Sequence, residues 1–252
     1  AEASAAQATP AAASSSSAGD GADARLFAAV KAGDLAAAQA AVAEGASVRA
    51  QGRGGEEPLH LACDAGHLDV AQWLHGAGAS LDVGDTSGYT PLHNACSEGH
   101  LGIAQWLHSA GAALDVTNRL GRTPLHTACF KGHLDIAQWL HGAGASLDAT
   151  SIQGLTPLHI TCDKGHLDVA QWLHSVGASL KATDIHGRTP LHLACDEGRM
   201  EIAQWLCGIG ADATLKTNAG STPAQVLQRP DRTVQLDQQA LRSTLACLVR
   251  RA

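Results

Sequence analysis

The amino-acid sequence predicts an all-α fold, a solenoid of paired antiparallel helices stacked along one axis. A fixed period of 33 residues separates five cysteines, Cys63, Cys96, Cys129, Cys162 and Cys195. Tryptophans from Trp73 to Trp205 and prolines from Pro58 to Pro223 recur at the same interval. Each period contains two short amphipathic segments. Isolated helices of this length are marginal in water, so neighbouring copies must cover each other's apolar sides.

Each period carries its own signals for where the two helices begin and end. Thr123 is a good N-cap, and the proline after it stands at the first helical position, where its missing N–H costs nothing. We therefore expect a first helix that runs from Pro124 to about Phe130 or Lys131 and stops at Gly132. The apolar spacing predicts a second helix over about 134–142, ended by Gly144. A loop of about a dozen residues then leads to the next Thr-Pro.

The period also predicts how the chain is divided. We expect a disordered Ala/Ser-rich linker over 1–22, because that segment has too little apolar bulk to fold. The repeats should follow as a partial repeat at 23–51, full repeats at about 52–84, 85–117, 118–150, 151–183 and 184–216, and a degraded repeat at 217–228. Residues 229–252 should form a capping helix with Leu241, Leu245 and Leu248 on one side. The alternative for this last helix is an amphipathic arm for a membrane or partner, suggested by Arg250 and Arg251.

The repeated unit resembles the ankyrin repeat family over about residues 23–228. The four residues TPLH stand at 90–93, 123–126, 156–159 and 189–192, each followed by a glycine turn and a second helix closed by Gly-Ala. The resemblance implies an ankyrin-type solenoid with β-hairpin-like loops projecting to one side and a concave surface that binds other proteins. The first full copy departs from this pattern because Glu57 replaces the capping threonine, so its cap should be weaker.

Histidine and cysteine recur in a pattern that raises the question of a metal site. The motif reads HLACDAGH at 60–67, with near-copies at 93–100, 126–133 and 159–166 and a fifth ending in Arg199. Gly132 lies between Cys129 and His133, so the helix ends before the second histidine. Equivalent residues of neighbouring copies should lie roughly 8–10 Å apart, too far to share a zinc ion or form a disulfide. We expect no metal and no cofactor, buried neutral histidines early in the first helices, and cysteines in tight helix contacts.

Composition narrows the classes of function. The net charge of −7 disfavours nucleic acid and anionic membranes as partners. No GxxxxGK or HExxH motif is present, and we expect no enzyme activity. Seven cysteines without a disulfide pattern favour the cytoplasm or nucleus, although the Ala/Ser-rich start also suits a transit peptide remnant. We expect a monomer. A metal or thiol buffer, and the targeting part of a larger kinase or ubiquitin ligase, remain alternatives.

Differences between the copies indicate where a partner binds. The outer-helix glutamines are the same in all five copies, whereas the loop tips and the ends of the first helices vary. In the family fold these variable positions share the concave face. The predicted binding residues are Tyr89, Arg119, Leu120, Arg122, Phe130, Lys131, Ile152, Leu155, Lys164, Ile185 and Arg188. Their apolar, aromatic and basic character predicts a partner protein with an acidic, partly apolar surface or segment. The alternative is that these loops simply tolerate change. The repeated tryptophans are expected to pack between copies rather than form a binding stripe.

Overall fold

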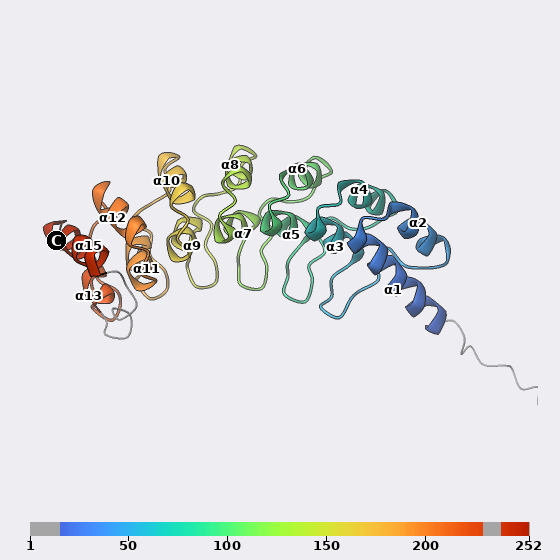
Figure 1. Cartoon of the computed structure of the whole chain (residues 1–252), viewed down its shortest axis with the longest axis horizontal. Coiled ribbons are helices and arrows are strands. Elements are labelled where there is room, and N and C mark those ends of the chain that lie inside the picture. Colours follow the sequence, from blue (N-terminus) through green and yellow to red (C-terminus); the bar gives the residue numbers. More distant parts are fainter. Residues whose placement is uncertain (1–15, 229–237, 252) are drawn as a thin grey trace, which may run out of the picture.

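The computed structural model of the chain describes residues 16–228 and 238–251, and every regular element among them is a helix. Helix pairs lie side by side along an arc, and the loops between the pairs project from its inner side (Figure 1). The pairs are α1 (Ser16–Ala32) with α2 (Leu35–Ala43), α3 (Pro58–Ala65) with α4 (Leu68–Gly76), α5 (Pro91–Glu98) with α6 (Leu101–Ser109), α7 (Pro124–Lys131) with α8 (Leu134–Gly142), α9 (Pro157–Lys164) with α10 (Leu167–Ser175), and α11 (Pro190–Asp196) with α12 (Met200–Gly208). The row ends with α13 (Pro223–Leu227) and α15 (Gln238–Arg251).

The curvature of the row follows from unequal packing of the two helix layers. The first helices α3, α5, α7, α9 and α11 pack closely against one another, whereas α4, α6, α8, α10 and α12 contact one another much less. Closer packing on one side bends the stack toward that side. The first helices and the loops therefore form the concave face, and the second helices form the outer face (Figure 1).

A histidine links the start of each first helix to the next repeat. The Thr123 backbone N–H donates to Nδ1 of His126 at 3.2 Å, and the Thr123 hydroxyl lies 2.9 Å from the same nitrogen. Since a carbonyl oxygen only accepts, Nε2 of His126 carries the proton and donates to the Leu155 carbonyl at 3.0 Å. His93, His159 and His192 repeat this arrangement with the carbonyls of Arg122, Arg188 and Ser221. These histidines are buried, as the sequence predicts.

A second histidine links the end of each first helix to the previous repeat. Nε2 of His133 donates to the carbonyl of Ser97, near the C-terminal end of α5, at 2.9 Å. The ring lies directly on Gly99, the left-handed C-cap of α5 with φ of 83°. A Cβ at Gly99 would come within 2.9 Å of the His133 ring. This position therefore requires glycine both for its backbone conformation and for the close approach.

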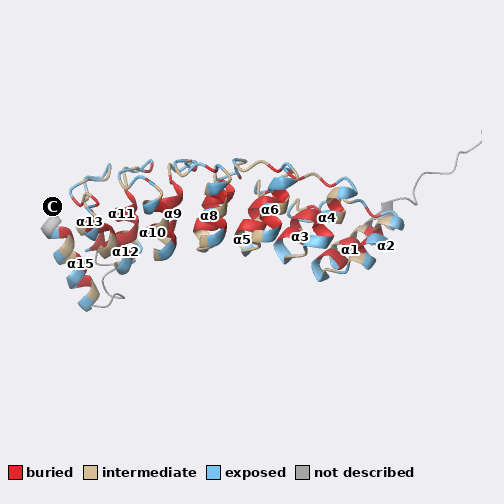
Figure 2. Ribbon diagram, turned by 90° about the horizontal axis from the view of Figure 1, so that it is seen from above, coloured by how far each residue is buried: buried red, intermediate tan, exposed pale blue. Residues whose placement is uncertain are grey.

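The core runs unbroken through the stack between the two helix layers (Figure 2). Leucine, alanine and cysteine fill the space between successive first helices, and Cys63 through Cys195 are buried free thiols. Burial raises the pKa of the Cys129 thiol to about 12, so it behaves as a small apolar residue. The tryptophans pack between repeats as expected: Trp139 is half-buried, and the His108 ring meets it edge-on with centroids 6.0 Å apart.

The two ends of the row are closed by helices. Helix α1 begins at Ser16, so the expectation of a disordered linker is wrong for residues 16–22, while residues 1–15 lie outside the described part. Residues 16–22 include two glycines, which disfavour helix, so the helix depends on the burial of Ala22 and Leu26, which anchor it. At the other end α15 packs on α12 and α13, with Leu241 and Leu248 buried. Residues 229–237 and the side chains of Arg250 and Arg251 lie outside the description. Among the described helices, none has the length and apolar character that a membrane crossing requires.

The buried histidines should make the fold sensitive to acid. Burial lowers the pKa of His93 and of His126 to about 4, below the ordinary 6.5. The unfolded chain therefore binds more protons below about pH 6.5, and the free energy of unfolding should fall as the pH falls. We expect a loss of roughly 1 kcal/mol for each of these two histidines between about pH 7.5 and 5.5, measured by urea unfolding.

The control replaces the titrating rings but keeps the cap. In the last repeat Gln225 takes the place of the histidine and accepts from the Thr222 N–H at 2.9 Å. Changing His93 and His126 to glutamine should therefore flatten the pH dependence. A wild-type unfolding free energy that stays constant over this pH range would contradict the prediction.

A threonine at position 57 should stabilise the protein. Glu57 is 5% exposed, and its Oε2 atom has no hydrogen-bond partner. Burial raises the pKa of this carboxyl group, and the hydroxyl–imidazole contact of the other repeats has no counterpart at His60. We expect E57T to raise the free energy of unfolding by about 1 kcal/mol, measured by urea unfolding at neutral pH. The reverse change T123E should destabilise, and an E57T protein less stable than wild type would contradict this account.

Candidate functional site

The recurring histidine and cysteine motif is part of the scaffold. Its two histidines use their Nε2 atoms in separate hydrogen bonds, that of His126 to a loop carbonyl and that of His133 to a helix end. In the fifth copy Arg199 replaces the second histidine, and its Nε donates to the Asp163 carbonyl at 3.0 Å. An arginine that keeps the same hydrogen bond shows that the position requires a donor, not a metal ligand. Over 16–228 and 238–251, no three His, Cys, Asp or Glu residues gather where they could hold a metal ion.

The loop tips form a continuous row along the concave face. Each tip is a tight turn: the Asn118 N–H donates to the Arg122 carbonyl at 3.0 Å, and the Gly121 N–H donates to the Asn118 carbonyl at 2.8 Å. The Ile152 N–H donates to the Leu120 carbonyl at 2.9 Å and so joins neighbouring tips. A Cβ at Gly121, whose φ is 70°, would lie 2.7 Å from the Ile152 nitrogen. This close approach keeps the tips in register.

Three aliphatic side chains are exposed on adjacent tips. Leu120 is 44% exposed, Ile152 is 63% exposed and Ile185 is 57% exposed. Backbone hydrogen bonds join their loops, since the Ile185 N–H donates to the Gln153 carbonyl at 3.0 Å. We call Leu120, Ile152 and Ile185 the loop-tip strip. Adjacent exposed aliphatic residues are more informative than scattered ones, because they leave apolar surface for a partner to cover.

An aromatic ring lies between two cations beside this strip. The Arg122 Cζ atom is 5.5 Å from the centroid of the Phe130 ring, and the Lys164 Nζ atom is 4.8 Å from it. All three side chains are half-buried. We call Arg122, Phe130 and Lys164 the cation–aromatic cluster. The structure thus brings together three of the predicted binding residues, from two neighbouring repeats.

Leu155 is a correction to the predicted set. The sequence predicts that Leu155 is an exposed apolar binding residue, but only 8% of it is exposed. It packs with Ile160 and Leu193 in a small apolar cluster on which Phe130 also rests. Leu155 therefore supports the concave face from beneath. The periodicity does not distinguish a side chain that turns into this cluster from one that faces solvent.

The basic residues of the face are mostly paired with acids from the same chain. Lys131 lies 3.6 Å from Glu98, and Lys164 lies 2.9 Å from Asp163. The paired side chains are between 29% and 43% exposed, so solvent screens them and each pair is worth at most about 1 kcal/mol. The expected positive charge of Lys131 and Lys164 is therefore reduced, but it stays available to a partner that replaces these acids.

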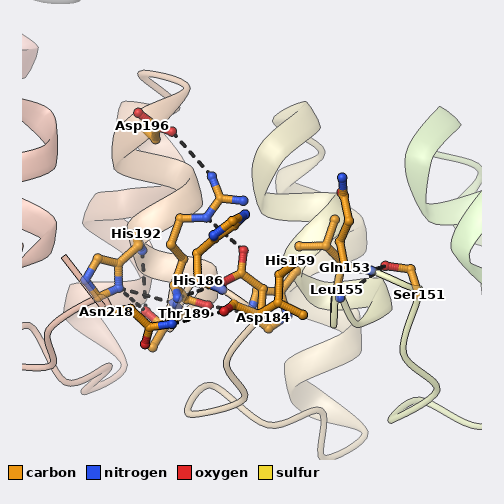
Figure 3. A network of polar contacts seen from close by, with 12 residues as sticks. Ser151, Gln153, Leu155, His159, Asp184, His186, Thr189, His192, Asp196 and Asn218 are labelled. Atoms are coloured by element: carbon orange, nitrogen blue, oxygen red, sulfur yellow. Dashed lines mark hydrogen bonds and ion pairs between the residues drawn. The ribbon is translucent and has the colours of Figure 1, made fainter. Parts of the chain in front are cut away.

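Arg188 is held more firmly than the two lysines. Its Nε donates to Oδ2 of the buried Asp184 at 2.7 Å, and its Nη1 lies 3.7 Å from the Asp196 carboxylate (Figure 3). Burial by itself raises the pKa of the Asp184 carboxyl, but the hydrogen bonds from the Arg188 backbone N–H and guanidinium outweigh it and hold this pKa below its usual value. Arg188 therefore contributes less free positive charge than the sequence suggests.

The remaining predicted residues lie toward the N-terminal side of the strip. Arg119 is exposed on its loop tip. Tyr89 is half-buried, and its ring meets the His93 ring edge-on with centroids 5.6 Å apart.

Two apolar residues beneath the face are not among the predicted binding residues. Ile160 and Leu193 occupy one register of the repeat, which holds Leu61, Asn94 and Thr127 in the preceding copies. The change from Asn94 and Thr127 to Ile160 and Leu193 is a signal that could have identified them. It places the apolar support in the fourth and fifth full repeats, where Phe130 of the cation–aromatic cluster rests on it.

A small hollow lies at the C-terminal end of the face. It measures about 270 Å³, and its lining residues are His186, Arg188, Asp196, Thr217, Asn218, Ala219 and Val226. This volume is slightly below the range typical of small-molecule sites. The hollow therefore does not favour a buried small-molecule ligand.

Comparisons with known proteins agree with this architecture. A family model described as ankyrin repeats (3 copies) matches residues 26–118, 72–151 and 125–217. The crystal structure of the human ASB11 ankyrin repeat domain superposes with a TM-score of 0.75 at 26% sequence identity, covering 90% of this chain and 97% of that one. Comparison with curated proteins gives no match.

Truncating Leu155 should destabilise the protein much more than truncating Leu120, because only Leu155 is buried. Leu155 is buried in the apolar cluster, so L155A should lower the free energy of unfolding by about 2 kcal/mol. Leu120 is exposed, so L120A should change it by less than about 0.5 kcal/mol. Urea unfolding of both variants checks this, and equal losses would contradict the assignment of Leu155 to the interior.

Proposed function

Because the chain belongs to the ankyrin repeat family, whose repeats are generally protein–protein interaction modules, we propose that it is a non-enzymatic scaffold that binds a partner protein on its concave face. The loop-tip strip carries this proposal. Three of the five large apolar residues that are exposed in the described part of the chain, Leu120, Ile152 and Ile185, stand on three successive loops. Their loops are held in register by backbone bonds, so a partner meets a preformed surface.

The cation–aromatic cluster supports a central contact next to the strip. Aromatic and arginine side chains over a buried apolar support are typical of residues that dominate binding energy. Phe130 rests on Leu155, Ile160 and Leu193, so its ring is already ordered before a partner arrives. Ordering in the free protein reduces the entropy lost on binding.

Charge indicates the chemistry of the partner. The chain is acidic overall, with a net charge of −7, but Arg122 and Lys164 both lie against the Phe130 ring, and Arg119 and Lys131 belong to the same repeat as that ring. A partner that complements these residues has an acidic, partly apolar surface or segment.

Nucleic acid is a poor partner for this chain, because the chain as a whole is acidic. We infer that the chain binds this partner as a monomer.

Removal of the loop-tip strip should abolish partner binding. The triple variant L120S, I152S and I185S changes exposed side chains, so it should fold normally, as judged by circular dichroism and urea unfolding. Partners captured from cell extract by the wild-type chain should be lost, with at least a 10-fold rise in Kd for a purified partner, since truncation of a binding centre typically costs more than about 1 kcal/mol per residue.

The matched control is a triple substitution on the outer face. Gln105, Gln138 and Gln171 are exposed on the second helices, and their change to alanine should leave capture intact. Loss of the same partners with both triple variants, or with neither, would refute the concave site.

A further inference from the structure

Two equivalent loops differ at a single side-chain atom. Asn118 and Asp184 occupy the same position of the repeat, two copies apart. In each, Oδ1 accepts from the backbone N–H groups two and four residues later, at 2.9 and 3.0 Å for Asn118 and at 2.9 and 2.8 Å for Asp184. Both side chains are therefore held in the same orientation. The second terminal atom, Nδ2 in one and Oδ2 in the other, takes the equivalent place.

At Asp184 this second atom is Oδ2, an acceptor that has a donor within the same loop. Oδ2 accepts from the Nε of Arg188 at 2.7 Å (Figure 3). The arginine lies four residues after the aspartate, and both residues belong to the same turn. In the fifth full repeat, Asp184 and Arg188 of the same loop therefore pair with each other.

At Asn118 the second atom is Nδ2, which is a donor and therefore cannot accept a hydrogen bond from the arginine. The arginine four residues later is Arg122, whose Nε is also a donor. Both Nδ2 of Asn118 and Nε of Arg122 are buried without a hydrogen-bond partner among the described residues, and Asn118 is only 4% exposed. A flipped amide would not help, because it would turn NH₂ toward the two backbone donors that Oδ1 now serves. The loop contains two unanswered donors.

The surroundings of these donors favour a negatively charged acceptor. Over residues 16–228 and 238–251, no carboxylate forms an ion pair with Arg122. Its guanidinium lies over the Phe130 ring, and Lys164 lies over the same ring. Hydrogen bonds from a guanidinium to a carboxylate are among the strong ones in proteins. An uncharged carbonyl would accept the same hydrogens but would gain nothing from the two cations.

We propose that Asn118 and Arg122 form a site for an aspartate or glutamate carboxylate of the partner protein. This inference rests on the proposed function. The partner's oxygen does for Arg122 what Oδ2 of Asp184 does for Arg188 in the fifth repeat, and accepts from Nδ2 of Asn118 and Nε of Arg122. Both atoms are buried in the free chain, so binding requires the half-buried Arg122 side chain to move and uncover them. Phe130 and the adjacent loop-tip strip cover the apolar part of the same segment, and Lys164 adds a second positive charge.

Acetate is the simplest probe of this site. We would titrate the ¹⁵N-labelled full chain with sodium acetate, with sodium chloride and with sodium phosphate at matched ionic strength, and follow the arginine Nε–H resonances. Acetate should shift the Arg122 resonance downfield until it saturates, whereas chloride should not, and Arg188 should not move because it is already paired. A response to phosphate without a response to acetate, or no saturable response at Arg122, would overturn the proposal.

Two reciprocal variants test the mechanism. N118D supplies the missing acceptor from within, so Arg122 should lose its response to acetate and the protein should become more stable to urea. D184N removes the acceptor of the fifth repeat, so Arg188 should gain a response. Asparagine already occupies this position at Asn118, so the fold accommodates it. An unchanged Arg122 response in N118D would refute the site.

The same variant separates this inference from the proposed function. N118D should weaken binding of the partner captured by the wild-type chain by about 10-fold or more, as expected for loss of a charge-assisted pair. Replacing the partner's acidic residue by its amide should weaken binding to the wild type but not to N118D. Capture that is unaffected by N118D but lost with the loop-tip variant would overturn the carboxylate site alone. Capture that survives both variants would overturn both proposals.

Discussion

Each repeat is tied to the next by a buried imidazole that can be satisfied in only one way. Nδ1 of His126 faces the N–H and hydroxyl of its capping threonine, so Nε2 must donate, and the Leu155 carbonyl of the next loop is its acceptor. A buried polar group left without its partner costs about 1–3 kcal/mol. The bond therefore fixes where each loop leaves the stack relative to the preceding helix. The regular spacing of the loops follows from this constraint, and so does the concave face that they build.

A scaffold fixed in this way leaves the loop tips free to differ. The tips are joined to one another by backbone bonds, such as that from Ile152 to Leu120, which do not depend on the side chains. Within each turn a single acceptor side chain organises the backbone, and Asp85, Ser151 and Thr217 serve in the same position as Asn118 and Asp184. Leu120, Ile152 and Ile185 contribute only backbone groups to this arrangement. Side chains at the loop tips can therefore change without loss of the fold. This explains why the exposed apolar residues lie on the tips.

The sequence alone predicts features that depend on neighbouring residues, such as where helices begin and end. The Thr-Pro start and the glycine stop predict a helix from Pro124 to about Phe130 or Lys131 and a second over about 134–142. Helix α7 ends at Lys131, and α8 runs from Leu134 to Gly142. The sequence was insufficient where several repeats meet. Leu155 looks like an exposed tip residue, but it is buried by Ile160 and Leu193 on two different helices, a packing that no single copy encodes. The ion pairs that reduce the basic charge of the face, such as Arg188 with Asp196, also join residues from different parts of a repeat.

The departure at Asn118 shows how a repeat protein can place recognition at one point without altering its architecture. The fifth repeat demonstrates that this turn can pair its arginine internally, as Asp184 does with Arg188. The third repeat keeps the turn, because Oδ1 of Asn118 still organises the backbone, but it leaves the Arg122 donor unanswered at a cost in stability. Local rules that are obeyed throughout a chain and broken at one position identify that position as a candidate for function. An external acceptor that bonds the Arg122 Nε removes this cost, so the donor that destabilises the free protein stabilises the complex.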